Sequence, residues 1–477
     1  MKRVLALLSF LCWHICLIYL PLLALFDKSS CFAEEEASDE DSESWEDDTD
    51  WYFYLNHDDA GPIVEYYAPN DEVTEKDKEL LTFLTPKVKG LRIVEFYAHW
   101  CPHCQHFRDH YVEFGKEMKT LAKQYFPKAE VNMFAVSCVP WKPVCNDFNI
   151  SGYPVVIIFE DGASNGTEIP AYDLHPFKLL SKLGDIDTVD ASTYLQDEEN
   201  RKQKKKIKKT NDDFDQQGQR HFLPRTQRDI YNDAHLSFDF AMRHAVFYKN
   251  GTLLEKDFTP FAFFVEQLKD ALPPTWKLKR LVSEIFDNID IVKRSEKKLI
   301  ETLDRYPPKK KSWSPSCTRG DKYAGYTCGL WELFHIMTIG IVEWNTFAGE
   351  DDWAYYRPEA ASLILRNYIE HFFGCEVCRV NFLHAYDTCE YDRCNRMGEY
   401  LGELDDWKEL PLWLFELHNG VNKRLLRERA EREHRAITKK DEISVQWPSR
   451  EDCPICWHSD GRWDPDNVYM FLRLTYW

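Results

Sequence analysis

Three pairs of cysteines are separated by only two residues, and their chemistry is the first question that this sequence raises. They are Cys101/Cys104 in WCPHC, Cys375/Cys378 in FFGCEVC and Cys453/Cys456 in CPIC. Two thiols at this spacing can hold a metal, exchange a disulfide with a substrate, or close a short loop. Closing so short a loop stabilises a fold only weakly, so redox or metal chemistry is the stronger interpretation.

The remaining cysteines also fall into neighbouring pairs. Of 15 cysteines, three precede residue 34, and an even number follows it, as is typical of a compartment in which disulfides persist. Besides the C-x-x-C pairs, we expect structural disulfides in Cys138/Cys145, Cys317/Cys328 and Cys389/Cys394. The second and third C-x-x-C pairs could offer four thiolates to zinc, but about 74 residues separate them, far more than in zinc ribbons. No metal is therefore expected.

The N-terminus predicts entry into the secretory pathway. Basic residues precede an apolar run from Val4 to Phe26, and small residues before Glu34 suit a signal peptidase. We expect residues 1–33 to be a cleaved signal peptide. An uncleaved anchor is the alternative, because the run is long enough to span a bilayer, and only then would the protein contact a membrane. Sequons at Asn165 and Asn250 fit a glycoprotein of the ER or Golgi lumen, or a secreted one.

Charge is concentrated in two polar segments. Residues 34–50 hold 11 acidic and no basic residues, more than half of the net charge of −20, so residues 34–60 are expected to form a disordered acidic tail. The rest is only mildly acidic, which argues against nucleic acid as a partner. A basic run at 201–209 is interpreted as part of a solvated, charged linker at 186–222.

Residues 61–185 show an α/β pattern around the first C-x-x-C. An apolar strand from Ile93 to Tyr97 leads into WCPHC, and a helix with apolar side chains at helical spacing follows. Cys101 is thus placed at a helix N-terminus, where free N–H groups and the helix dipole favour its thiolate. His103, between the cysteines, can add positive charge. This arrangement predicts an oxidising disulfide.

WCPHC, with GYPVVIIF about 50 residues later, resembles the thioredoxin fold. By this resemblance Pro154 would be cis and would face the Cys101–Cys104 disulfide. Glu95 would be the buried carboxylate that assists proton transfer beneath Cys104. The CPHC centre resembles those of the more oxidising members.

Residues 223–310 contain no cysteine and show helical periodicity, interrupted at Pro273 and Pro274. Without chemistry of their own, they are interpreted as a helical spacer or docking platform.

Residues 311–477 continue the helical pattern and bring aromatic and polar side chains near the second pair. Trp331 and His335 are four residues apart, as are His418 and Asn422, so each pair shares one helical face. A lone histidine on an apolar helix is more often a core residue than a ligand. Two histidines, an asparagine and two tryptophans around a reactive pair instead favour a flat ring cofactor.

This last pattern resembles the Erv-type sulfhydryl oxidase domain, a helical bundle that binds FAD beside a C-x-x-C. The whole order resembles the quiescin sulfhydryl oxidases, in which the Cys-free helices are a pseudo-Erv region. The expected fold class is a multidomain chain with an α/β thioredoxin fold, an all-α region and an all-α FAD-binding bundle. The resemblance implies flavin contacts at Trp331, His335, Asn381, Phe415, His418, Asn419, Val421, Asn422 and Trp447. The chain departs from the family pattern at Ala324, Asn381 and Ser444, which affects the phosphate and adenine contacts.

The resemblance implies a flavin-linked thiol oxidase. Reduced secretory proteins and small thiols would be oxidised at Cys101/Cys104, and electrons would pass through Cys375/Cys378 and FAD to O2, giving H2O2. Cys453/Cys456 would lie near the flavin without an assigned role. A monomer is expected, because the Cys-free helices would cover the surface through which Erv domains pair. The alternatives are a disulfide isomerase or chaperone without flavin oxidase activity, and a redox-inactive scaffold.

Overall fold

The computed structural model describes most of the chain beyond its N-terminal 50 residues. It describes residues 51–477 apart from 56, 70–72, 85–87, 126–129, 172–173, 175, 181–225, 248–250, 319–323, 349–355 and 399–403. The predicted leader, the acidic run and the charged linker lie outside the described residues. Among those described, no helix is both long and apolar enough to cross a membrane.

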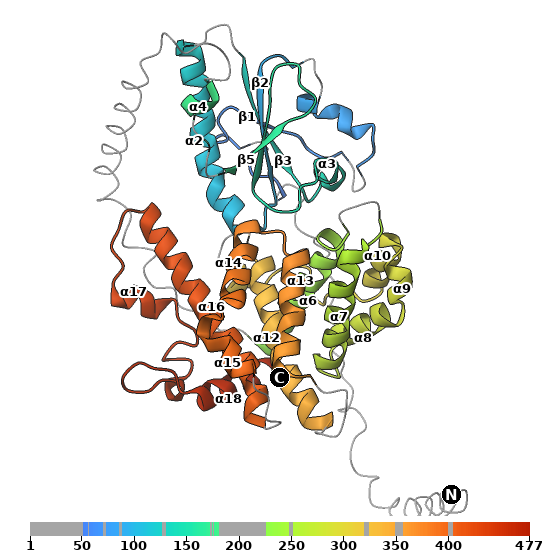
Figure 1. Ribbon diagram of the computed structural model, residues 1–477, viewed down its shortest axis with the longest axis vertical. Coiled ribbons are helices and arrows are strands. Elements are labelled where there is room, and N and C mark those ends of the chain that lie inside the picture. The colour runs from blue at the N-terminus through green and yellow to red at the C-terminus, as the bar shows by residue number, and fades with distance from the viewer. Residues whose placement is uncertain are drawn as a thin grey trace, which may run out of the picture. The chain divides into compact units, whose positions relative to one another are not determined.

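The N-terminal part contains a five-stranded mixed sheet in the order β1–β3–β2–β4–β5 (Figure 1). Its strands are β1 (Ile63–Glu65), β2 (Leu91–Tyr97), β3 (Val131–Ser137), β4 (Val155–Phe159) and β5 (Thr167–Pro170). Strands β1 and β2 run parallel to β3, whereas β4 is antiparallel to β2 and β5. The central strand β2 is buried along its whole length, as its apolar run predicts.

Helices pack on this sheet, and alternate residues of β2 face opposite sides. The helices are η2 (Asp77–Leu80), η3 (Thr82–Leu84), α2 (Pro102–Tyr125), α3 (Lys142–Asp147) and α4 (Pro176–Leu180). Ile93 and Tyr97 join the hydrophobic cluster that includes α2, while Val94 and Phe96 join the cluster around Trp141. Glu95 has the same parity as Ile93 and Tyr97, so it faces the side of α2 and the first cysteine pair.

Residues 51–55 and 57–60 belong to this fold, so the prediction of a disordered tail over 34–60 is wrong for these residues. Tyr52, Phe53 and Tyr54 are each at most 3% exposed. The Phe53 ring stacks on Tyr97 with 4.3 Å between ring centroids. The acidic run ends at Asp50. The aromatic WYFYL segment that follows buries enough apolar surface to hold this segment on the sheet.

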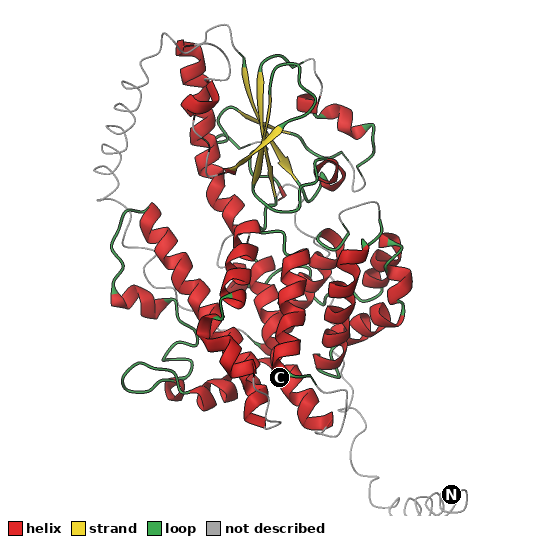
Figure 2. Ribbon diagram, in the orientation of Figure 1, coloured by secondary structure: helices red, strands yellow, loops and turns green. Residues whose placement is uncertain are grey.

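The described residues after 226 form helices apart from their connections (Figure 2). The Cys-free region contains α6 (Gln227–His244), α7 (Glu255–Ala271), α8 (Lys277–Asp287), α9 (Ile289–Val292) and α10 (Glu296–Asp304). The last region contains α11 (Pro315–Thr318), α12 (Tyr326–Ala348), α13 (Pro358–Phe372), α14 (Glu376–Asp387), η6 (Glu390–Asp392), α15 (Arg393–Gly398), α16 (Leu404–Arg432), α17 (Lys439–Ser444), η7 (Pro454–Cys456) and α18 (Pro465–Tyr476).

The Cys-free helices pack closely against α12. The Ser237 hydroxyl of α6 donates to the Tyr326 carbonyl at 2.8 Å. A Cβ at Gly340 of α12 would overlap the backbone of Ala271 in α7, so only glycine permits this approach. The predicted spacer is therefore part of the same packed helical body as the last region.

Five neighbouring cysteine pairs are disulfides in the structure, and one is not. The bonds are Cys138–Cys145, Cys317–Cys328, Cys375–Cys378, Cys389–Cys394 and Cys453–Cys456. Cys101 and Cys104 are free thiols. The second and third C-x-x-C pairs each close on themselves instead of meeting as four thiolates.

Candidate active site

The first dithiol lies where β2 ends and α2 begins, and both of its thiols are fully buried. The Cys101 thiol donates to the carbonyl of Tyr153 at 3.8 Å. The Tyr153–Pro154 peptide bond is cis, as the sequence predicts. Burial, together with neighbouring Cys101 and Glu95, raises the pKa of the Cys104 thiol well above its ordinary value. Cys104 therefore needs a local proton acceptor before it can attack a disulfide.

Glu95 is positioned to be that acceptor. Its side chain is fully buried, and its Oε2 accepts a hydrogen bond from the Tyr54 hydroxyl at 2.5 Å. Its Oε1 is buried with no hydrogen-bond partner among the described residues. Burial raises the pKa of Glu95 to about 8. A carboxyl of this acidity exchanges protons with a thiol near neutral pH.

This buried carboxyl carries a stability cost that depends on pH. A carboxyl whose pKa rises from 4.5 to about 8 on folding destabilises the folded state increasingly as pH climbs between those values. We expect Glu95→Gln to stabilise the thioredoxin domain by about 2–4 kcal/mol at pH 8, and by much less at pH 5. Thermal unfolding at both pH values measures this, with the exposed Glu113→Gln of α2 as control. Equal gains at pH 5 and pH 8 would contradict it.

The second pair begins α14, and its backbone is paired with the loop of the cis-proline. Cys375 is fully buried at the N-terminus of α14, and Cys378 is half-buried. Tyr153 N–H donates to the Gly374 carbonyl at 2.9 Å, and Glu376 N–H donates to the Tyr153 carbonyl at 3.3 Å. These bonds make a parallel bridge between Tyr153 and Cys375. The Cys375–Cys378 disulfide therefore lies against the loop at Tyr153, to which the Cys101 thiol also donates a hydrogen bond.

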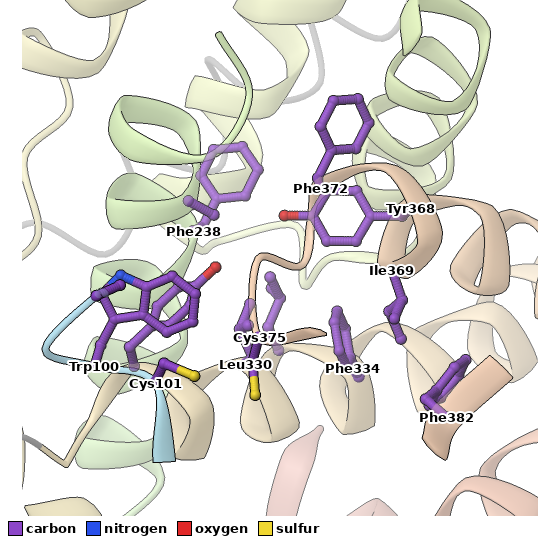
Figure 3. Close-up of a cluster of buried hydrophobic side chains, with 14 of the residues drawn as sticks. Trp100, Cys101, Phe238, Leu330, Phe334, Tyr368, Ile369, Phe372, Cys375 and Phe382 are labelled. Atoms are coloured by element: carbon purple, nitrogen blue, oxygen red, sulfur yellow. The ribbon is translucent and has the colours of Figure 1, made fainter. Parts of the chain in front are cut away.

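Apolar and aromatic side chains enclose the meeting point (Figure 3). Figure 3 shows the Cys101 and Cys375 side chains within one cluster of buried residues, with Trp100 beside Cys101. The Trp100 ring lies 4.7 Å from Tyr326 and 6.2 Å from Phe373, between ring centroids. Arg379 of α14 also donates to the Ser151 carbonyl at 3.1 Å. The enclosure keeps water away from sulfurs that exchange.

His103 lies between the two redox pairs, but it is not the positive charge that its position in WCPHC suggested. One of its ring nitrogens is within 4.8 Å of the sulfurs of Cys375 and Cys378. Burial, and then the guanidinium groups of Arg424 and Arg432, lower the pKa of His103 to about 4. The ring is therefore neutral at pH 7 in this arrangement and does not add the expected positive charge, chiefly because it is buried and also because α16 supplies cations nearby.

Aromatic side chains expected to contact a flavin meet between α12, α16 and the chain before α18. Trp331 and His418 stack with centroids 4.2 Å apart and planes 4° from parallel. His335 Nε2 and His418 Nδ1 are 3.0 Å apart and share a hydrogen bond. The Trp447 ring lies 5.8 Å from that of His335. The structure thus brings together four of the predicted cofactor residues from distant positions in the chain.

The other predicted cofactor residues have different surroundings. Asn419 holds Trp447 in place: its amide donates to the Trp447 carbonyl at 2.7 Å and accepts from the Trp447 N–H at 2.8 Å. Phe415 is buried, with its ring 6.2 Å from Trp447. Asn381 donates to Val377 within its own helix. Val421 and Asn422 are half-buried on α16.

Sequence reasoning missed the contribution of α18. Tyr476 stacks on His335 at 5.1 Å, and Phe471 lies 5.4 Å from Trp447. The aromatic residues of the C-terminal VYMFLRLTYW stretch were the available signal. The third pair lies next to this helix, because the Asp464 N–H donates to the Cys456 carbonyl at 2.9 Å.

The composition of this aromatic group suits a flat heteroaromatic cofactor. It offers parallel ring planes for stacking and imidazole nitrogens for hydrogen bonds. Trp331 and His418 are half-buried, whereas their neighbours in the bundle are mostly buried. Part of the Trp331–His418 stack is therefore accessible to the ring of a cofactor. The second cysteine pair is carried by α14, a neighbour of α13, which packs on α16. The residues present therefore fit FAD next to a C-x-x-C.

Comparison with known proteins agrees with this geometry. Residues 74–173 match the Thioredoxin family, and residues 328–448 match the Erv1 / Alr family. Sulfhydryl oxidase 1 of Oryza sativa subsp. japonica is 23% identical over 83% of this chain and 75% of its own length. Sulfhydryl oxidase 2 of Arabidopsis thaliana is 24% identical over 80% of this chain and 74% of its own.

Among solved structures, the sulfhydryl oxidase fragment of human QSOX1 aligns over 53% of this chain and 97% of the fragment, with 22% identity and a TM-score of 0.39. The match to a thioredoxin domain, the match to an Erv domain and their order over most of the chain establish the class of enzyme. The cofactor of this class is FAD, and its substrates are thiols with O2 as acceptor. The two domain matches, in this order, and the similarity to sulfhydryl oxidases over most of the chain support a quiescin-type sulfhydryl oxidase.

Proposed function

We propose that this thiol oxidase acts as a relay in which Cys101/Cys104 takes electrons from the thiols of client proteins and passes them to Cys375/Cys378. The observation that carries the proposal is the pairing of Tyr153 with Gly374 and Glu376, which seats the second disulfide on the loop beside the Cys101 thiol. A free dithiol at one side and a disulfide at the other are the two reactants of a thiol–disulfide exchange.

The exchange follows from the properties of the four sulfurs. The Cys101 thiolate attacks Cys375, and Cys378 leaves as a thiolate, so a Cys101–Cys375 mixed disulfide forms. Cys104 then gives its proton to Glu95 and attacks Cys101, which releases Cys375 as a thiolate and restores the Cys101–Cys104 disulfide. Two electrons have moved from the first pair to the second, and the proton of Cys104 rests on the Glu95 carboxylate.

Trp331, His335, His418 and Trp447, with Tyr476, would hold the flavin. When bound, FAD supplies a two-electron acceptor for the reduced second pair and a route to O2, which yields H2O2. Asn419 would act indirectly, because its side-chain amide holds the backbone of Trp447 in place.

We further propose that the oxidation takes place in the secretory pathway, on reduced cysteine-containing proteins of the ER or Golgi lumen, or after secretion. The predicted N-terminal leader, the sequons and the twelve cysteines beyond residue 33 support this setting. Small thiols would be accepted as well, and the protein would act as a monomer.

Trapping of the mixed disulfide tests the relay without relying on the flavin. In a Cys104→Ser, Cys378→Ser variant, a mild thiol oxidant is expected to join Cys101 to Cys375, and mass spectrometry of a digest would detect the linked peptides. The matched control, Cys101→Ser with Cys375→Ser, leaves Cys104 and Cys378 and should give no link. Absence of the Cys101–Cys375 peptide, or equal linking in the control, would refute the proposed order of exchange.

A further inference from the structure

Tyr54 joins two buried carboxyl groups of the thioredoxin domain. Its hydroxyl donates to Glu95 at 2.5 Å, and its backbone N–H donates to Glu65 at 2.8 Å. Tyr54 lies outside the part of the chain that matches the Thioredoxin family, which begins at residue 74. The contact with Glu95 is therefore made by the segment that precedes this match.

Glu65 anchors the segment that carries Tyr54. Its carboxylate accepts the N–H groups of Tyr54 and Leu55, each at 2.8 Å, and the Tyr97 hydroxyl at 2.5 Å. Phe53, fully buried, stacks on Tyr97 and donates its N–H to the Tyr97 hydroxyl at 2.7 Å. With its neighbours fixed in this way, the Tyr54 hydroxyl has a single defined position against Glu95.

The hydroxyl acts on the proton balance of Glu95. A donor stabilises the ionised form of a carboxyl, so the Tyr54 contact lowers the pKa of Glu95, opposing the larger effect of burial. Negative charge on Glu65 acts in the other direction and raises it, while Arg108 of α2 lowers it. The other groups that face Glu95 are Cys101, which directly precedes α2, Cys104 and Tyr111 of α2, and Tyr97 of β2.

We propose that Tyr54 is a positioning residue of the redox centre: its hydroxyl orients the Glu95 carboxyl group and favours its ionised form, so that Glu95 can take the proton of Cys104. This inference rests on the proposed relay, in which Cys104 must lose its proton before it attacks Cys101. Among the described residues, the Tyr54 hydroxyl donates to Glu95 and makes no hydrogen bond to a sulfur. It occupies Oε2 of Glu95 and leaves Oε1, which has no hydrogen-bond partner among the described residues, to receive the proton.

Tyr54→Phe tests the inference, because it removes the hydroxyl and retains the ring. We expect the rate of electron transfer from Cys101/Cys104 to Cys375/Cys378 to rise with pH in the wild type, with a midpoint near 8, the pKa of Glu95. In Tyr54→Phe that midpoint should move up by about one pH unit, and the rate at pH 7 should fall by about tenfold. Acid quenching of the full-length protein after mixing with a reduced protein, followed by alkylation and mass spectrometry, counts the thiols at each pair.

Tyr52→Phe is the matched control. Tyr52 lies in the same buried segment, but its hydroxyl accepts from the Ala68 N–H at 2.9 Å, so its removal should leave the pH midpoint unchanged. A uniform fall of the rate in both variants, without movement of the midpoint in Tyr54→Phe, would indicate a packing role and overturn the inference. In a Glu95→Gln background, Tyr54→Phe should cause no further change, and any additional shift would also overturn it.

Two further variants separate this inference from the proposed relay. Glu65→Gln removes a negative neighbour of Glu95, and its amide oxygen can still accept the Tyr54 and Leu55 N–H groups, which both bond to one Glu65 oxygen. It should therefore move the midpoint to lower pH, the opposite direction to Tyr54→Phe. Cys101→Ser should abolish the transfer altogether. If Cys101→Ser left the transfer intact, the relay would be wrong; if it abolished transfer while Tyr54→Phe left the midpoint unmoved, only the role of Tyr54 would be wrong.

Discussion

Replacing Cys101 with serine is expected to lower the oxidation of reduced proteins by about three orders of magnitude or more, because the client thiolate attacks the Cys101 sulfur of the Cys101–Cys104 disulfide, and this disulfide cannot form in the variant. Activity on a small dithiol such as dithiothreitol should largely remain. The Cys375–Cys378 disulfide is enclosed by the loop at Tyr153 and by Trp100, but Cys378 is half-buried, so a small thiol can approach where a folded protein cannot.

Oxygen consumption with reduced ribonuclease and with dithiothreitol measures both activities on one preparation. Cys375→Ser is the complementary variant and should lose both, since every route passes through the second pair. A Cys138→Ser, Cys145→Ser double variant controls for the loss of cysteines from the same domain, because this disulfide lies in the hydrophobic cluster on the other face of the sheet. Equal losses on both substrates in Cys101→Ser would show that small thiols also depend on the first pair.

The local chemistry of the first site could be predicted from the sequence because it depends on residues close together in the chain. The strand, the C-x-x-C and the helix are consecutive, and the burial of Glu95 follows from its place in an uninterrupted apolar strand. The cis bond at Pro154 was implied by the resemblance of WCPHC and GYPVVIIF to the thioredoxin fold.

Properties set by distant segments could not be predicted in the same way. The low pKa of His103 results from its burial in the folded chain and, to a smaller extent, from Arg424 and Arg432, which α16 brings from more than 300 positions away. The role of Asn419 in holding the Trp447 backbone was equally hidden, because helical spacing shows which face a residue occupies and not which backbone it meets. Tyr54 was overlooked for another reason. The acidic run at 34–50 suggested that the disordered tail extends to residue 60, which would include Tyr54.

The second prediction with a large effect concerns Gly152, which lies where the two redox pairs are seated against each other. A Cβ added there would be 2.5 Å from the Glu376 Oε2 and 3.0 Å from the Glu376 Cβ. The carboxylate can swing away, but the Cβ belongs to the first turn of α14 and can move only with the helix. A branched side chain at position 152 must therefore push α14, and the disulfide that begins it, away from the cis-proline loop.

Gly152→Val is expected to cost this seated arrangement about 1–3 kcal/mol, the usual penalty for overpacking, which lowers its population roughly 5- to 150-fold. Transfer from the first pair to the second should fall by the same factor, whereas a client's reduction of Cys101–Cys104 and the oxidation of dithiothreitol should each remain near normal. Quenched-flow thiol counting separates these steps. Ser151→Val is the matched control, since this exposed neighbour contributes its backbone carbonyl to Arg379 and keeps it when the side chain changes. If Gly152→Val transferred electrons at the wild-type rate, the pairing of Tyr153 with the Cys375 segment would not be the arrangement in which the two dithiols react.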